Sequence, residues 1–176
     1  TLIVEFGFNK ISIIKVTKLK ENRKSLSDYI IAIFFSQLIL YILNILFLLL
    51  LYLFLPFSLE LLKLILILSL SSLGLIFTPN WLFLGLERIK ELIPFTLTGR
   101  LISILLTIIF VNGPDDLLVS GLIQSSALLI SGIICILYLI TKRILFSYTA
   151  KLADIIQSYK DSFFIFITNF ASNLYI

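Results

Sequence analysis

The sequence has no histidine, one cysteine and few charged residues, and each shortage argues against a class of protein. Among its 176 residues there is no His, and Cys135 is the only cysteine. The side chains that most often serve as general bases, zinc ligands or disulfide partners are therefore missing. Charged residues make up 14% of the chain, against about 25% in soluble domains. We expect neither an enzyme nor a bound metal or cofactor.

Apolar residues are abundant: they form 60% of the chain, and the mean hydropathy is +1.13. A helix needs about 20 apolar residues to cross ~30 Å of hydrocarbon. Four runs meet this requirement, and uninterrupted runs of this length favour helices over alternating barrel strands. The sequence thus predicts an all-α integral membrane protein, a polytopic bundle of transmembrane helices. The four spans are Tyr29–Leu55, ended by Pro56, then Leu64–Leu86, Leu92–Val111 and Leu117–Thr141.

The basic residues are unevenly distributed between the connecting segments. Six of the 14 lie in residues 10–24, two in residues 87–91 and four in residues 142–160. Cytoplasmic loops carry an excess of Lys and Arg, so we expect these three loops in the cytoplasm and the remaining two loops outside. The net charge of +4 then reflects contact with a membrane surface, and no nucleic-acid partner is expected.

Two shorter apolar segments flank the four spans. Thr1–Phe8 resembles the end of an earlier helix, and Ser162–Ile176 resembles the start of a later one. The chain also begins without a methionine. We therefore expect it to be a fragment of a longer protein.

Polar residues in the third predicted span form a stripe around Arg100. Thr96, Arg100, Ser103 and Thr107 are spaced at i, i+4, i+7 and i+11, which places them on one helix face. A charge near the middle of a membrane costs about 2.5–3.5 kcal/mol unless it is paired or hydrated. This pattern predicts that the stripe lines a polar cavity. The alternative is that Arg100 extends to the cytoplasmic interface.

Further polar side chains in the spans are candidates for the same cavity. Gln37 and Asn44 are seven residues apart, so they share a helix face, as do Ser120 and Gln124. Asn169 occupies a corresponding position in the last apolar segment. Small polar residues also mediate packing between membrane helices, and this reading stays open for each of them.

The segment around residues 78–90 is predicted to be a structural and gating loop. Pro79 removes a backbone donor and so interrupts the helix, and Gly85 permits a close backbone approach. Trp81 is expected to anchor at the level of the lipid head groups.

Three motifs resemble those of a known family. They are EFGFNKISIIKV at residues 5–16, TPNWLFLGLERIK at residues 78–90 and FVNGPDDLLVSGLIQS at residues 110–125. They are similar to loops of O-antigen and polysaccharide flippases in the multidrug/oligosaccharidyl-lipid/polysaccharide exporter superfamily. The resemblance covers the whole chain, although Leu84 and Asn112 stand where the family often has Gln and Lys.

The resemblance implies most of the N-terminal half of a twelve-helix, MATE-like transporter. Residues 1–141 would form the end of helix 2 and helices 3 to 6, residues 142–161 a cytoplasmic linker, and residues 162–176 the start of helix 7. It also implies alternating access and a multi-pass location in the bacterial inner membrane. The substrate would be an undecaprenyl-pyrophosphate-linked oligosaccharide, either an O-antigen or a capsular repeat unit. Membrane lipids, a polysaccharide polymerase and glycosyltransferases would be the partners.

Two alternatives remain at this point. A drug or cation exporter of the same superfamily would share the fold, but we would expect carboxylates inside its spans, and the four complete spans have none in their interiors. A non-transporting membrane component or a glycosyltransferase should show Asp, Glu or His clusters, and the sequence offers only Asp115 and Asp116. That pair is more typical of a turn.

Overall fold

The computed structural model describes residues 2–55, 58–145 and 151–174, and regular structure in these ranges is helical throughout. Four helical stretches, namely α3, α4 with α5, α6, and η1 with α7, are long and apolar enough to cross a membrane. The predicted all-α bundle of membrane helices is confirmed. The helices are α1 (Leu2–Glu5), α2 (Phe8–Leu19), α3 (Arg23–Phe54), α4 (Leu59–Phe77), α5 (Asn80–Gly85), α6 (Ile89–Phe110), the 3-10 turn η1 (Pro114–Asp116), α7 (Leu117–Thr141) and α8 (Leu152–Leu174).

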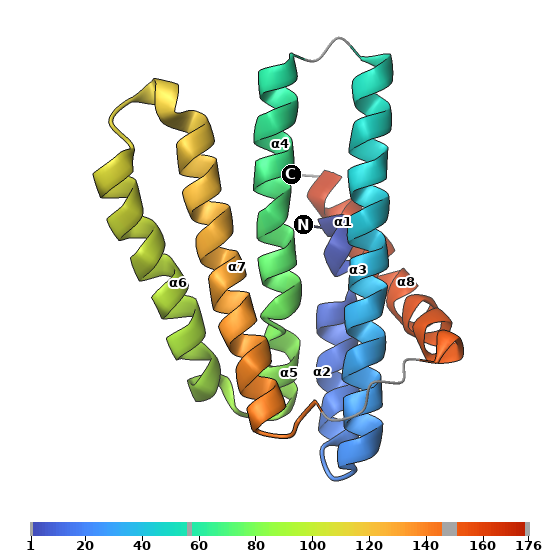
Figure 1. Cartoon of the computed structure of the whole chain (residues 1–176). Coiled ribbons are helices and arrows are strands. Elements are labelled where there is room, and N and C mark those ends of the chain that lie inside the picture. Colours follow the sequence, from blue (N-terminus) through green and yellow to red (C-terminus); the bar gives the residue numbers. More distant parts are fainter. Residues whose placement is uncertain (1, 56–57, 146–150, 175–176) are drawn as a thin grey trace.

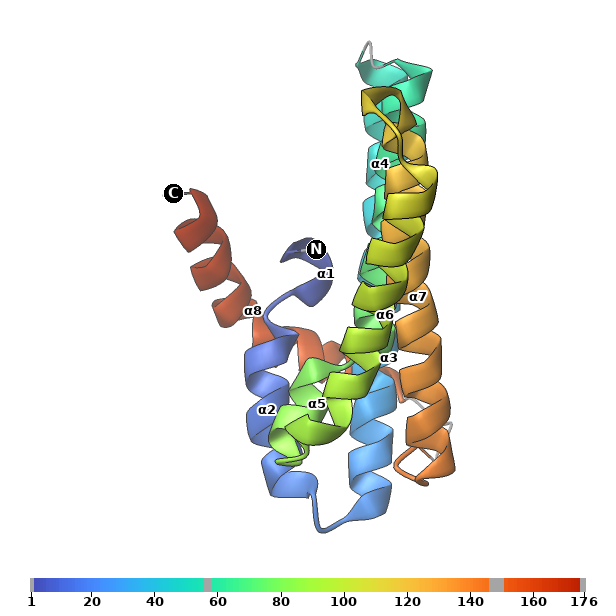
Figure 2. The ribbon, with the colours of Figure 1, turned by 90° about the vertical axis from the view of Figure 1, so that its left-hand side faces the viewer.

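The long helices stand side by side in a row with the order α6, α7, α4, α3 (Figure 1). Helices α1, α2 and α8 lie together on one face of this row (Figure 2). Helices α4 and α7 pack closely because glycines of each helix meet the backbone of the other. A Cβ at Gly74 would lie 2.6 Å from the carbonyl carbon of Leu128, and one at Gly132 would lie 2.8 Å from the Gly74 carbonyl oxygen. Small residues thus allow the two helices to approach closely.

The buried core lies near one end of the long helices, where α2, α3, α5 and α7 meet. Phe8, Trp81, Phe83 and Leu139 are among its large side chains, and each is at most 2% exposed. Away from this core, α3 and α6 expose many Leu, Ile and Phe side chains. Apolar faces of this extent suit contact with lipid tails or with further membrane helices.

The helix bounds follow from capping as much as from hydropathy. Helix α7 has the bounds predicted from the sequence. Helix α3 begins at Arg23 because the Asn22 side chain accepts a hydrogen bond from the Ser25 amide at 3.2 Å, and Ser58 caps α4 in the same way. Both helices therefore start earlier than the apolar runs predicted. The predicted end of the first span at Pro56 lies outside the described residues.

The prediction of a loop at residues 10–24 was wrong, since α2 occupies most of this segment. Its helical face carries Phe8, Ser12 and Val16, all buried, while Lys18 and Lys20 face outward. Long apolar runs do not reveal such a helix, because its buried residues alternate with basic ones. Gly7, with φ of +74°, separates α1 from α2, and a Cβ there would lie 2.9 Å from backbone atoms of α8.

Helix α8 also begins earlier than predicted, at Leu152, inside the segment assigned to a linker. Residues 146–150 of that segment lie outside the described ranges. The division into a first bundle, a linker and a second bundle stays a prediction.

The loops predicted to be inside and those predicted to be outside lie at opposite ends of the long helices (Figure 1). The α2–α3 turn, the α5–α6 connection and the end of α7 are at one end, and η1 and the start of α4 are at the other (Figure 1). We expect the first end to be cytoplasmic because it carries most of the basic residues. Cys135 can be replaced, and single cysteines placed at the exposed Lys18 and Asp115 positions. In intact cells an impermeant thiol reagent should label position 115 and leave position 18 unlabelled; the reverse pattern would overturn this orientation.

Candidate functional site

Arg100 lies at the centre of α6, about 17 Å from Ile89 and about 15 Å from Phe110 along the helix. It is exposed, and no hydrogen bond or ion pair within the described ranges includes it. Its neighbour Gly99 is buried against α7, where a Cβ would lie 3.0 Å from the Cβ of Ser131. Because successive helix residues are ~100° apart, Arg100 points to the side of this contact. The helix therefore presents a charge at mid-depth that has no partner among the residues the structure describes.

The other members of the predicted stripe share this helix. Thr96, Ser103 and Thr107 are half-buried, and the Thr96 hydroxyl donates to the Ile93 carbonyl oxygen at 3.1 Å. In the described structure none of these hydroxyls is hydrogen-bonded to the Arg100 guanidinium.

The structure does not bring all predicted cavity residues together. Gln37 and Asn44 lie on α3 and Arg100 on α6, and these are the outer helices of the row, with α4 and α7 between them (Figure 1). Gln124 is exposed on α7, with its side chain 3.5 Å from the Ser120 hydroxyl. Asn169 lies on α8 and accepts a hydrogen bond from Lys10 at 3.3 Å. In the described part of the chain, these residues therefore do not line one common cavity.

The predicted loop at residues 78–90 is a helix break followed by a short buried helix. Helix α4 ends at Phe77, and Pro79 precedes α5. Gly85 lets α5 pack against α2, since a Cβ there would lie 2.7 Å from the Val16 side chain. The prediction that Trp81 anchors at the head groups was wrong. It is 2% exposed and packs edge-on to Tyr29 in the core, with ring centroids 6.3 Å apart.

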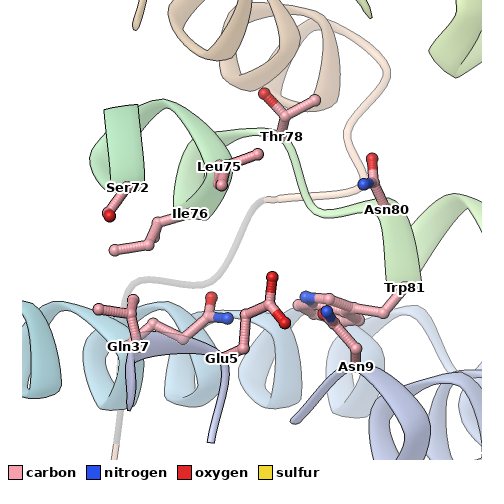
Figure 3. Close-up of a pocket in the computed structure, with 10 residues that line it drawn as sticks. Glu5, Asn9, Gln37, Ser72, Leu75, Ile76, Thr78, Asn80 and Trp81 are labelled. Atoms are coloured by element: carbon pink, nitrogen blue, oxygen red, sulfur yellow. The ribbon is translucent and has the colours of Figure 1, made fainter. Parts of the chain in front are cut away.

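A polar pocket lies between this helix break and α1, α2 and α3 (Figure 3). Its volume is about 30 Å³. The carboxylate of Glu5 lies between the side chains of Gln37 and Trp81. Gln37 is 5% exposed, and its side-chain carbonyl oxygen has no hydrogen-bond partner among the described residues. The remaining lining residues are Val4, Asn9, Ser72, Leu75, Ile76, Thr78 and Asn80.

Sequence reasoning placed Gln37 in a cavity but missed Glu5 and Asn9. Both belong to the EFGFN motif that carries the family resemblance, so a polar function for the motif could have been suspected. The pairing with Gln37 could not, because it depends on α1 packing against α3. The four complete spans contain no carboxylate in their interiors, but Glu5 of α1 lies beside them. A cation exporter is therefore not excluded by the lack of carboxylates.

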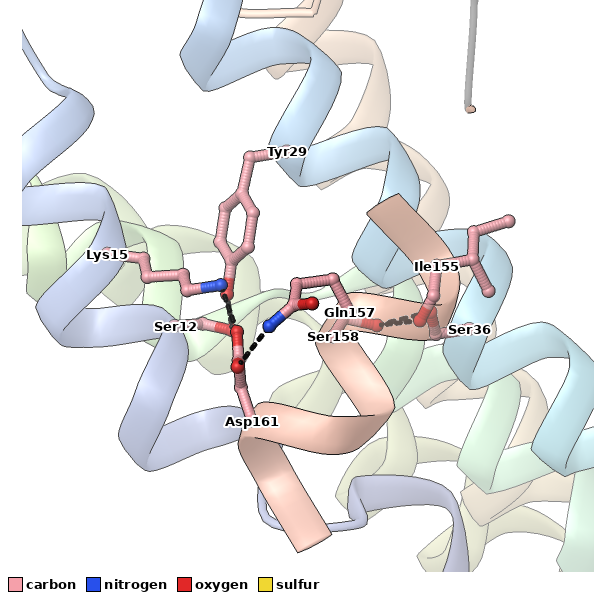
Figure 4. Close-up of polar contacts among 8 residues, drawn as sticks. All are labelled: Ser12, Lys15, Tyr29, Ser36, Ile155, Gln157, Ser158 and Asp161. Carbon is pink, nitrogen blue, oxygen red and sulfur yellow. Dashed lines mark hydrogen bonds and ion pairs between the residues drawn. The ribbon is translucent and has the colours of Figure 1, made fainter. Parts of the chain in front are cut away.

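Helix α8 is joined to α2 and α3 by polar contacts (Figure 4). Lys15 of α2 forms an ion pair with Asp161, which also accepts a hydrogen bond from Gln157 at 2.7 Å. The hydroxyls of Ser36 and Ser158 are 2.9 Å apart. Partial burial acts to raise the pKa of Asp161, but the hydrogen bonds from Lys15 and Gln157 outweigh it, so the pKa lies below its ordinary value. The carboxylate therefore stays charged and paired with Lys15 at neutral pH.

Comparisons with known proteins agree with this architecture. Over 174 residues, the chain is 31% identical to a protein of Escherichia coli (strain K12) named "Putative O-antigen transporter". The match covers 99% of the chain and 42% of that relative, so the chain spans about two fifths of the relative's length. A protein of the same name from Shigella dysenteriae is 34% identical over 97 residues, which cover 54% of the chain and 24% of that relative.

No solved structure matches the chain. The family described as "Polysaccharide biosynthesis protein" matches residues 1–176, which is the whole chain. The resemblance to O-antigen and polysaccharide flippases is thereby confirmed. The chain therefore belongs to the polysaccharide biosynthesis protein family.

Proposed function

We propose that this chain is part of a flippase that moves a lipid-linked oligosaccharide across the bacterial inner membrane by alternating access. The observation that carries the proposal is Arg100, an exposed charge at mid-depth of a membrane helix without a partner in the described ranges. An anionic group such as a pyrophosphate needs a counter-charge in a low-dielectric slab. The planar guanidinium binds phosphate oxygens in bidentate fashion, and the hydroxyls along α6 provide further polar contacts.

The lipid part of such a substrate needs no polar site. The exposed apolar faces of α3 and α6 are compatible with a tail that stays in the bilayer while the head group crosses. No bond is made or broken in this step, and the names of the relatives support transport as well.

Deleting the gene from its own bacterium tests the proposal. We expect surface polysaccharide to be lost and the lipid-linked oligosaccharide to accumulate in the inner membrane, with both effects reversed by the full-length gene. Unchanged surface polysaccharide would reject the flippase.

Export of a drug or another cation is a second candidate, and Glu5 is the observation that favours it. A carboxylate among membrane helices could bind a cationic substrate. In that case the deletion should raise sensitivity to cationic drugs and leave surface polysaccharide unchanged.

Alternating access also makes a prediction about the contacts of α8, which the family resemblance assigns to the second bundle. If the bundles move against each other, the Lys15–Asp161 pair must break in each cycle. Reversing one charge with Lys15→Asp should lower export about two- to fivefold, since partly exposed ion pairs contribute at most ~1 kcal/mol. The double variant Lys15→Asp/Asp161→Lys should recover most of it. A double variant no better than the single one would show that the pair has no role in export.

A further inference from the structure

We propose that a groove between α3 and α7 binds one acyl chain of an anionic phospholipid from the surrounding membrane, with the lipid phosphate at basic residues that border the groove. The groove has a volume of about 510 Å³, and every described residue that lines it is apolar. This inference goes beyond the proposed transport of an oligosaccharide and does not depend on it.

The walls of the groove follow from helical periodicity. On α7, Ile133, Leu137 and Ile140 are spaced at i, i+4 and i+7, which places them on one helix face. On α3, Ile31 and Phe35 are spaced at i and i+4 and form the opposite wall. The three α7 side chains are 40–57% exposed although they are large and apolar. In a membrane protein, such a surface is covered by hydrocarbon.

The groove faces away from α8. Ser36 directly follows Phe35, and its hydroxyl is 2.9 Å from that of Ser158 on α8. Because successive helix residues are ~100° apart, Ile31 and Phe35 point at least ~100° away from this contact. Helices α1, α2 and α8 lie together on one face of the row, and none of the described groove residues belongs to them (Figure 2). The second bundle, which by the family resemblance continues from α8, is therefore expected on the other side, and the groove is left to lipid.

The groove has the depth of one leaflet. Of the α7 residues that line it, Ile133 is farthest from the end of the helix, about 12 Å from Thr141. On α3, Phe35 is about 18 Å from Arg23. Half of the hydrocarbon core is about 15 Å thick. The groove thus extends from near mid-depth to the end expected to be cytoplasmic, which is the depth that one acyl chain occupies.

Basic residues border the groove at this end. Ile140 and Leu145 both line it, so the connection between them, which carries the exposed Arg143, lies at its edge. On α3, Lys24 is exposed and precedes Ile31 by seven residues, so the two share a helix face. No ion pair in the described ranges includes Lys24 or Arg143. Each wall therefore leads from an apolar surface to a cation.

The apolar groove and the cations together define the ligand. A hydrocarbon chain covers the apolar surface, and Lys and Arg at the interface attract anionic lipid head groups. The guanidinium of Arg143 can bind two phosphate oxygens. A zwitterionic lipid has the chain without the net charge, and a free phosphate has the charge without the chain. The lipid of the transported substrate has both, but its path is expected on the face where the two bundles meet.

Native mass spectrometry of the purified full-length protein tests the proposal without any transport measurement. Dioleoyl phosphatidylglycerol, dioleoyl phosphatidylcholine and undecaprenyl phosphate are titrated separately. One phosphatidylglycerol molecule should bind about tenfold more tightly than phosphatidylcholine, because the two cations favour the anionic head group. Tighter binding of undecaprenyl phosphate than of phosphatidylglycerol, if lost when the groove is filled, would assign the groove to the substrate lipid and overturn the proposal.

A tryptophan placed in the groove shows whether binding occurs there. Leu137 is 57% exposed, so Leu137→Trp adds its bulk in the groove and outside the core. It should weaken phosphatidylglycerol binding about tenfold, since the acyl chain loses its place. Leu122→Trp is the matched control, because Leu122 is 47% exposed on the same helix, about 22 Å from Leu137, and does not line the groove. This variant should bind as the wild type does.

Charge variants at exposed positions test the head-group site separately. Lys24→Gln/Arg143→Gln should remove the preference for phosphatidylglycerol over phosphatidylcholine. Lys18→Gln/Lys90→Gln removes two other exposed charges, which do not border the groove, and should keep this preference. The proposal is overturned if the wild type shows no preference, if Lys24→Gln/Arg143→Gln keeps it, or if Leu137→Trp binds phosphatidylglycerol as tightly as the wild type does.

Discussion

Arg100→Ala is expected to lower export about tenfold or more, because it removes the one positive charge that the described α6 carries at mid-depth. Hydrogen bonds to charged groups contribute about 1.5–3 kcal/mol, which corresponds to roughly a 10- to 150-fold change in rate when they act in the transition state. Arg100→Lys should retain part of the activity, since the ammonium group keeps the charge but not the planar geometry. Surface polysaccharide per transporter molecule is the quantity to measure.

The control for this prediction is Arg23→Ala. Arg23 is exposed in the first turn of α3, far from the mid-depth of the helix. It should leave export unchanged. If Arg100→Ala exports as well as the wild type at matched membrane abundance, Arg100 only extends to the membrane interface, and the cavity assignment is wrong.

Gly85→Leu is expected to reduce export about tenfold or more while the protein still inserts into the membrane. Even a Cβ at this position would lie 2.7 Å from the Val16 side chain, so α5 must move away from α2. Overpacking of this kind costs about 1–3 kcal/mol, and it displaces the helix that carries Trp81 and borders the polar pocket. Export and membrane abundance should be measured together, with melting of the purified variant as a third readout.

Gly113→Leu is the matched substitution. Gly113 lies in the connection before η1 with φ of −167°, and a Cβ there would meet no atom within 4 Å. This variant should behave as the wild type does. Equal export by Gly85→Leu and the wild type would mean that the segment at residues 78–90 only connects helices.

The sequence predicted the helices best where polar residues bracket an apolar run. Helix α7 is bounded by the acidic turn before Leu117 and by the basic pair after Thr141, so its limits were read correctly. In that turn Asp116 accepts a hydrogen bond from the Asn112 amide at 2.8 Å. Helix α2 was missed because its buried face is short and interrupted by lysines, so hydropathy alone did not separate it from a loop.

The site was less predictable than the fold because it depends on which helices become neighbours. Periodicity placed Arg100 and Thr96 on one face, which holds for any straight helix. It could not reveal that α3 and α6 stand at opposite ends of the row, or that Trp81 is enclosed by α2 and α3. Glu5 and Gln37 are brought together by the bend at Gly7, which no periodic pattern encodes.

Direct translocation by the reconstituted full-length protein tests the central claim most directly. Liposomes would carry a lipid-linked oligosaccharide in the inner leaflet, and an impermeant sugar-cleaving enzyme outside would report its arrival in the outer leaflet. Our account predicts rapid cleavage with the wild type and slow cleavage, close to that of protein-free liposomes, with Arg100→Ala. Cleavage by the wild type at the protein-free rate would contradict the assignment of this chain to a flippase.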